Sequence, residues 1–247
     1  MIHTSPELLK FPDIQHGFFE QSATEMPSLN CAFVNSESAE QVHAQRQFMI
    51  KIMRGEETPL LTLKQIHSAT VHIVESTSQI LPEGDALVTR RKNIALGVLT
   101  ADCGPVIFAD PTNEVIGIAH AGWRGAMAGI LGKTIKAMES LGAERDSLYA
   151  ILGPTIQQSH YEVGSEFEEL LGSDAHLFLK KSQKDGHFYF DLPHYIVMEL
   201  EKLGVASPYN LALNTFTGNF FSRRKALQKS QHPLFKGLCN LSAIAMS

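Results

Sequence analysis

The sequence of 247 residues has few cysteines, only short apolar runs and no excess of basic residues. Its three cysteines, Cys31, Cys103 and Cys239, are too few for a disulfide framework and fit a reducing compartment. No apolar run approaches the ~20 residues that a membrane-spanning helix needs. The first residues have neither the basic nor the apolar region of a secretory signal. We therefore expect a cytoplasmic protein without a membrane partner.

The charge balance is slightly acidic, because 26 Asp and Glu residues outnumber 21 Lys and Arg residues. A nucleic-acid-binding surface usually gives a basic excess, so this balance argues against a nucleic-acid partner. The hydrophobic fraction of 44% is that of an ordinary globular chain. The sequence has no internal repeat and no low-complexity linker, and domains average ~150 residues. We expect a single domain over residues 1–247.

The apolar pattern predicts several short strands and a few helices. Short runs rich in Val and Ile, each bounded by turn residues, are typical of strands. These runs are residues 70–75, 85–89, 94–100, 106–109, 115–119, 148–152, 209–213 and 240–246. Runs that follow one another without an intervening helix are expected to pair antiparallel. Helices are predicted over residues 127–141 with Gly142 as the cap, over residues 165–171, and between Asp191 and Gly204. Clustered strands with helices between the later ones favour an α+β fold.

Three stretches place chemically active side chains at the ends of predicted elements. They are KQIH at 64–67, TADCGP at 100–105 and HAGWRG at 120–125. His67, Cys103 and His120 offer two imidazoles and a thiol, which are ligands that zinc prefers, and catalytic zinc sites commonly use three protein ligands. The ligands lie 36 and 17 residues apart, and no metal motif has this spacing. The residues alone leave an alternative, in which the histidines cap strand ends and the cysteine packs in the core.

Basic residues near these stretches are candidates for binding an anion. Arg124 precedes a predicted helix, whose free N–H groups attract phosphate, and the glycines of residues 122–125 allow either that contact or tight packing. Trp123 can stack on a base or belong to the core. The RRK run at 223–225 can contact phosphate or form a solvated basic face.

The blocks ADCGPV and HAGWRG, in this order, make the chain similar to a known family. KQIHSATVHIV, GDALVT, AILGPTIQQSHYEVG, FDLPHYI and FFSRRKA resemble further blocks of the same family. It is the YfiH-like family, also called polyphenol-oxidoreductase laccases, which includes zinc-dependent purine nucleoside phosphorylases and peptidoglycan-editing factors. The resemblance covers about residues 60–247 well. It implies an α+β fold of packed mixed β-sheets flanked by helices, in a single YfiH-like laccase-type domain.

The resemblance also implies a metal centre and two activities on purines. The metal is expected on His67, Cys103 and His120, with zinc as the ion and copper as the alternative. The implied reactions are phosphorolysis of adenosine, inosine, guanosine and methylthioadenosine, and deamination of adenosine. Arg46 matches the place of a family arginine and is expected to pair with phosphate. Asp102 is expected, by its position, to shuttle a proton or to orient a ligand.

Three departures from the family bear on substrate choice and on activity. Residues 20–27 replace a segment that is rich in Arg and Gly in the family. Arg223 stands where Tyr is usual, and Asn214 stands where Cys or Asp is common. None of these changes affects the three expected metal ligands.

Three other functions remain open from the sequence. Cys103 can be the nucleophile of a hydrolase that edits a peptidoglycan precursor, activated by His120 or His67. A copper-dependent oxidase of phenols is the second, although such redox centres use more histidines than these two. A zinc-stabilised binding module is the third, and it requires a fourth ligand, Cys31 or Asp102, that closes the site.

Overall fold

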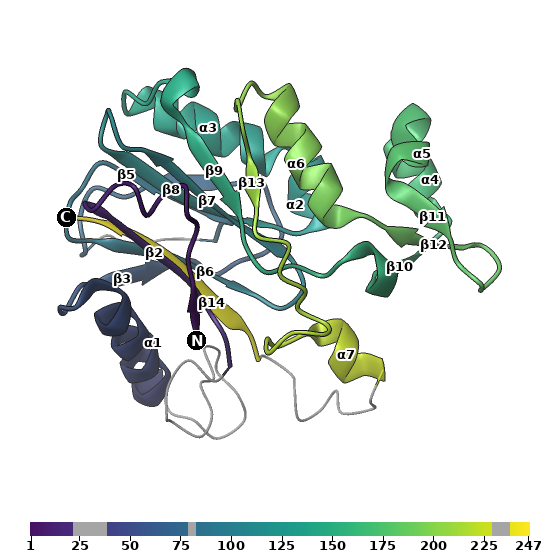
Figure 1. Cartoon of the computed structure of the whole chain (residues 1–247), viewed down its shortest axis with the longest axis horizontal. Coiled ribbons are helices and arrows are strands. Elements are labelled where there is room, and N and C mark those ends of the chain that lie inside the picture. The colour runs from purple at the N-terminus through teal and green to yellow at the C-terminus, as the bar shows by residue number, and fades with distance from the viewer. Residues whose placement is uncertain (22–38, 79–82, 229–237) are drawn as a thin grey trace.

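Two mixed β-sheets packed on each other form the centre of the computed structural model, which describes residues 1–21, 39–78, 83–228 and 238–247 (Figure 1). Within these residues the larger sheet has six strands, in the spatial order β13 (Tyr209–Asn210), β9 (Tyr149–Leu152), β7 (Gly104–Asp110), β8 (Val115–Ala121), β5 (Ala86–Thr89) and β4 (Val71–Ile73). The smaller has five, in the order β1 (Ile2–His3), β2 (Ile14–Phe19), β14 (Asn240–Met246), β6 (Ala95–Thr100) and β3 (Leu60–Thr62). The pairs β3–β6, β4–β5 and β9–β13 are parallel, and the other pairs in these two sheets are antiparallel.

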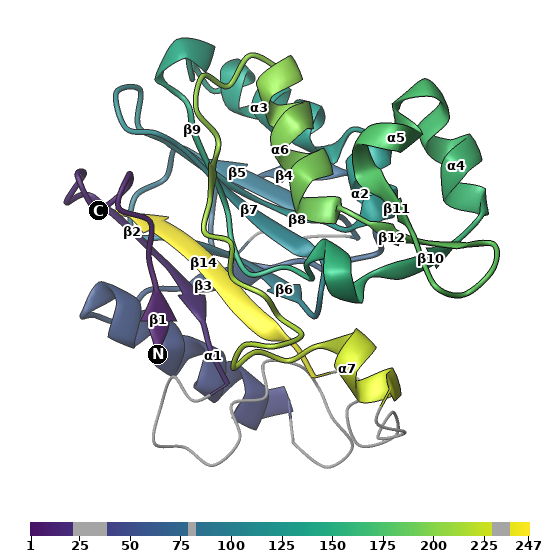
Figure 2. The same ribbon diagram turned by 45° about the vertical axis from the view of Figure 1, so that its right-hand side comes forward.

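Helices cover the outer faces of the two sheets (Figures 1 and 2). α3 (Ile130–Ser140) and α6 (Leu192–Lys202) pack on the six-stranded sheet, and α1 (Ala39–Arg54) packs on the five-stranded sheet. β7, β8 and β14 are therefore covered on both faces, and every residue in them is buried. No helix within the described residues has the length and apolar character needed to cross a membrane.

A smaller lobe projects beside α6 (Figure 2). It contains a three-stranded antiparallel sheet of β10 (Glu162–Gly164), β12 (His187–Phe190) and β11 (Leu179–Lys181), with α4 (Glu166–Leu171) and α5 (Ala175–Phe178). Buried phenylalanines of the lobe belong to the same apolar core as α3 and α6. The remaining elements are α2 (Trp123–Met127), α7 (Arg223–Gln228) and the 3-10 turns η1 (Arg145–Ser147), η2 (Gln158–His160) and η3 (Gly172–Asp174).

The predicted α+β class, with packed mixed sheets flanked by helices, is confirmed. Asp191 caps α6 as expected, by accepting a backbone N–H at 3.0 Å. The single helix expected over residues 127–141 is wrong, because Gly129 has a φ of +85° and separates α2 from α3. Antiparallel pairing is confirmed for β7 and β8. It is wrong for the consecutive strands β4 and β5, which pair parallel, and for β6 and β7, which lie in different sheets.

Candidate metal centre

The β7–β8 hairpin brings Cys103 and His120 together. β7 begins directly after Cys103, and β8 ends one residue after His120. In the antiparallel register, Gly104 lies opposite Ala121, and Pro105 lies opposite His120. The start of one strand therefore lies beside the end of the next. The 17-residue separation of these two side chains is thus spanned by one hairpin, which explains why it matches no local zinc motif.

The buried carboxylate of Asp85 brings His67 to the same place. Asp85 directly precedes β5, which pairs with β8, and its Oδ1 lies 2.8 Å from His120 Nδ1. The carboxylate also accepts the backbone N–H groups of His67 (3.0 Å) and Ser68 (2.6 Å), and the Ser68 hydroxyl (2.7 Å). His67 has a φ of +59°, which a non-glycine residue holds only where its surroundings enforce it. One carboxylate therefore positions both the loop of His67 and the ring of His120.

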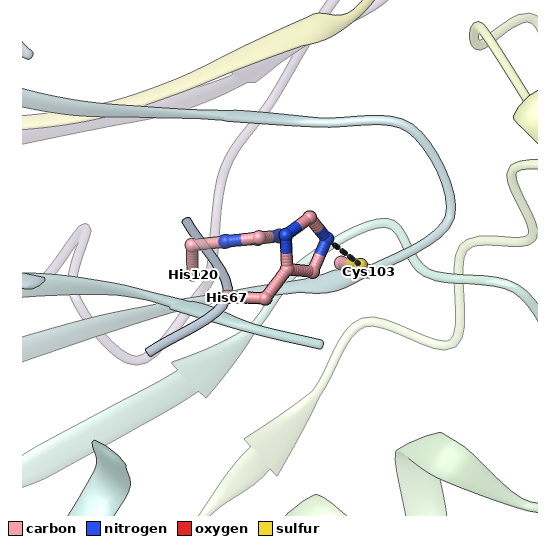
Figure 3. Close-up of side chains that lie close together, drawn as sticks. All are labelled: His67, Cys103 and His120. Carbon is pink, nitrogen blue, oxygen red and sulfur yellow. Dashed lines mark hydrogen bonds between the residues drawn. The ribbon is translucent and has the colours of Figure 1, made fainter. Parts of the chain in front are cut away.

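The side chains of His67, Cys103 and His120 converge (Figure 3). One ligand atom from each residue lies within 4.8 Å of the other two. Cys103 Sγ is 3.9 Å from His67 Nε2, and the two imidazole rings meet edge to face with centroids 4.8 Å apart. Because Asp85 holds Nδ1 of His120, the Nε2 atom is left to bind a metal. His120 is buried and His67 is exposed, so this group could bind a metal ion that solvent and substrate can reach.

The charges of this group favour a thiolate at Cys103 and a protonated imidazole at His120. Burial opposes ionisation of Cys103, but the positive charge of His120 and hydrogen bonds to both histidines outweigh it and lower the thiol pKa to about 6. Burial also opposes protonation of His120, but the Cys103 thiolate and the Asp85 carboxylate raise the imidazole pKa to about 9. The pKa of Asp85 falls below its ordinary value, because its hydrogen bonds to His120 and Ser68 outweigh its burial. The pair therefore favours a thiolate beside an imidazolium, and a bound metal ion would take the place of the His120 proton.

Two glycines of the HAGWRG stretch allow α2 to pack closely on this group. A Cβ atom at Gly122 would lie 2.8 Å from Cys103 Sγ and 3.2 Å from His67 Cδ2. A Cβ atom at Gly125 would lie 2.9 Å from the carbonyl oxygen of Ser68. These distances are shorter than ordinary van der Waals contact. Of the two roles expected for these glycines, the structure therefore supports tight packing.

Asp102 connects the loop of Cys103 to later parts of the chain. Its Oδ1 accepts the Thr215 hydroxyl and its Oδ2 accepts the backbone N–H of Arg224, both at 2.7 Å. Its carbonyl oxygen accepts the Thr155 hydroxyl at 2.9 Å, and its φ is +92°. These contacts fit a residue that orients the Cys103 loop, whereas the role of Asp102 as a proton shuttle stays a prediction.

Arg46 is buried on α1, beside the strand that leads to His67. Its Nη1 donates a hydrogen bond to the Thr62 hydroxyl of β3 at 3.3 Å. The segment after β3 is held by Gln65, whose side chain makes two hydrogen bonds with the backbone of Leu99, at 2.7 and 2.8 Å. The structure thus places Arg46 against β3, the strand that leads to His67. Its pairing with phosphate stays a prediction.

Sequence reasoning missed the role of Asp85. The available signal was the GDALVT block, in which an acidic residue stands directly before a strand that is buried throughout. A charge at a buried position requires partners, and here the partners are the candidate ligands. Cys31, one of the two possible fourth ligands, lies outside the described residues, and so do residues 22–27 of the divergent segment.

The fold and the site together define a mixed two-sheet α+β protein with a His-Cys-His group where β7 and β8 meet. The chain belongs to the family described as multi-copper polyphenol oxidoreductase laccase, whose model matches residues 15–232. The resemblance to YfiH-like proteins is thereby confirmed.

Relatives and solved structures agree with this membership. The chain is 34% identical over 192 residues to a purine nucleoside phosphorylase of Rickettsia conorii, an alignment that covers 76% of this chain and 78% of the relative. It is 34% identical over 153 residues to a purine nucleoside phosphorylase of Aquifex aeolicus, covering 62% of this chain and 69% of the relative. A crystal structure of a Neisseria meningitidis protein aligns over 96% of this chain and 95% of the Neisseria chain, at 27% identity and a TM-score of 0.80. The YfiH protein of Bacillus licheniformis aligns over 100% of this chain and 96% of the YfiH chain, at 23% identity and a TM-score of 0.84. The two proteins therefore share a fold.

Proposed function

We propose that the protein is a zinc-dependent purine nucleoside phosphorylase that also deaminates adenosine. Its substrates are adenosine, inosine, guanosine or methylthioadenosine, together with phosphate, and its location is the cytoplasm. The observation that carries the proposal is the convergence of His67, Cys103 and His120 within 4.8 Å. Relatives at 34% identity that are named purine nucleoside phosphorylase support the choice of reaction.

The donor set fits zinc as the metal. Two imidazoles and a thiolate are common zinc ligands, and the exposed position of His67 leaves room for substrate. When bound, zinc would supply Lewis-acid polarisation and activation of water. Copper is the alternative ion. Among the described residues no other group of three such ligands is found.

The residues of the chain have distinct tasks in phosphorolysis. A phosphate oxygen forms a bond to ribose C1′ while the C1′–N9 bond breaks, and the purine leaves with the electron pair and takes up a proton. Arg46 and Arg124 supply positive charge for the phosphate. Asp85 fixes the two histidines, and Asp102 holds the Cys103 loop and is the candidate proton shuttle.

The test is the product mixture formed from adenosine and phosphate. Zinc-loaded protein is incubated with both compounds, and the products are separated by chromatography, with Cys103→Ala as the control. We expect adenine and ribose 1-phosphate from phosphorolysis, inosine from deamination, and hypoxanthine from phosphorolysis of that inosine. The control should form none of them, while its circular dichroism stays that of the wild type.

Two results would contradict the proposal. Absence of all four products at high protein concentration would refute the reaction. Turnover that persists after a chelator has removed all metal would refute the zinc dependence. Loss of turnover on chelation, with recovery on adding zinc, is the expected outcome.

A further inference from the structure

Among the described residues, two guanidinium groups near the metal group have no anionic partner. Arg124 lies in α2 and is exposed, and Arg224 lies in α7 and is half-buried. Among the described residues, neither side chain forms an ion pair or donates a hydrogen bond. Each instead lies over an aromatic ring: the guanidinium carbon is 4.3 Å from the Trp123 centroid in the first case and 5.4 Å from the Tyr161 centroid in the second.

The backbone fixes both arginines close to Cys103. Arg224 donates its N–H to the carboxylate of Asp102, the residue before Cys103, at 2.7 Å. Arg124 follows two residues after Gly122, which leaves no room for a Cβ atom against Cys103 Sγ. Two segments that are 100 residues apart in the sequence therefore approach the same thiolate.

The phenol of Tyr161 is close enough to both arginines for their charges to affect it. Burial raises the pKa of its phenol, the negative charges of Cys103 and Asp102 raise it further, and the positive charges of Arg224 and Arg124 oppose the increase. The phenol is therefore within electrostatic range of the thiolate and of both guanidinium groups. Two cations that have no ion-pair partner among the described residues therefore lie on segments that approach the candidate metal centre.

The chemistry of stacked guanidinium groups indicates an anion as their ligand. A guanidinium that lies over an aromatic ring uses its face, so its N–H donors remain available at the edge. Two such groups can bind a phosphate dianion through charge-assisted hydrogen bonds, and Arg is favoured for this geometry. We propose that Arg124 and Arg224, held by Trp123 and Tyr161, form the subsite that binds inorganic phosphate beside the metal. This proposal rests on the proposed phosphorylase function, and it adds Arg224 to the residues that hold the co-substrate.

Direct binding of inorganic phosphate tests the subsite. Calorimetric titration is carried out on the zinc-loaded and the metal-free protein, for the wild type, Arg124→Gln and Arg224→Gln. The matched control is Lys136→Gln, because Lys136 is an exposed cation of α3, the helix that follows Arg124. We expect each test variant to weaken phosphate binding about tenfold or more in both metal states, as loss of a charged hydrogen-bonding group does. The control should bind as the wild type does.

Kinetics separate this proposal from the proposed function. The KM for phosphate should rise in Arg124→Gln and Arg224→Gln, while their zinc content stays that of the wild type. Arg224→Lys should recover part of the affinity, because it restores the charge without the paired donors. If phosphate binding depends on the two arginines but the protein shows no phosphorolysis, the proposed function is refuted and the subsite stands. Unchanged affinity in both variants, or no binding by the wild type, would overturn the subsite.

Discussion

Asp85 shows why the metal group is hard to derive from spacing alone. Its carboxylate bonds to residues 18 and 35 positions away, and the bonds form only after β5, β8 and the loop after β3 have assembled. No local pattern records such contacts. The ligand types and their places at element ends could be predicted from the sequence, and the family resemblance singled out the same three residues. The carboxylate that positions them could not be predicted, because its partners are set by the sheet.

We expect Asp85→Asn to weaken zinc binding by about 10- to 100-fold, the usual effect of removing a partner of a metal-binding histidine. The amide keeps an acceptor for His120, but its NH₂ group cannot accept the N–H and hydroxyl of Ser68. Competition with a chromophoric chelator measures the affinity, and the absorption spectrum of the Co²⁺-substituted protein reports the ligand geometry.

Ser68→Ala is the matched control, because it removes one hydroxyl contact to Asp85 and leaves the carboxylate and its bonds to the backbone N–H groups. Its affinity for zinc should fall less than that of Asp85→Asn. Equal affinity of Asp85→Asn and the wild type, with unchanged Co²⁺ spectra, would show that Asp85 does not position the ligands.

The strands could be predicted well, whereas their sheet membership could not. Apolar runs with turn residues between them located β5 to β9 and β14, since strand formation depends on local pattern. β6 and β7 are separated by three residues only, yet they join different sheets, because each finds its partner in a distant strand. α1, β2 and β3 were not predicted; the strands β1 and β3 have only two and three residues. Pairing between distant strands leaves no periodic signal in the sequence.

The break between α2 and α3 should depend on Gly129. Its φ of +85° is unfavourable for any residue with a Cβ atom, and no atom lies within 4 Å of the place where that Cβ would be. Gly129→Ala should therefore lower the free energy of unfolding by about 1–2 kcal/mol through backbone strain alone. Urea denaturation followed by circular dichroism measures this change.

Gly132→Ala provides the control within α3. Its Cβ would meet only the end of the Leu203 side chain, at 3.2 Å, and alanine favours a helix over glycine by about 1 kcal/mol. It should be neutral or stabilising. If Gly129→Ala proves as stable as the wild type, the left-handed residue does not cause the break.

The stability of the entire chain should depend on pH through His16. This side chain is buried on β2, and its Nε2 accepts the backbone N–H of Ser5 at 2.7 Å. Burial lowers its pKa to about 4, whereas the pKa of an ordinary histidine is about 6.5. Between these values the unfolded chain binds a proton that the folded chain does not. The stabilisation of the folded chain by neutral His16 is complete above pH 6.5 and is lost as the pH falls toward 4.

Urea titrations between pH 4 and pH 7 test this expectation. For the wild type, His16 should make the free energy of unfolding fall by up to about 3 kcal/mol across the interval. His16→Gln keeps an acceptor for Ser5 without a titrating group, so its pH dependence should be weaker. His176→Gln, a change at an exposed histidine, should keep the wild-type slope. Identical slopes for His16→Gln and the wild type would exclude this source of acid sensitivity.

The position of β14 has a consequence for synthesis on the ribosome. β14 lies between β2 and β6, and Ser242 pairs with both Phe18 and Val98. At roughly 5–20 residues per second, the nascent β2 waits on the order of tens of seconds before its partner is made. During that time the edges of β2 and β6 that will pair with β14 have no native partner, and α1 has only part of its sheet to cover. The five-stranded sheet therefore closes only when translation has passed residue 246, and a premature stop before residue 240 removes its middle strand.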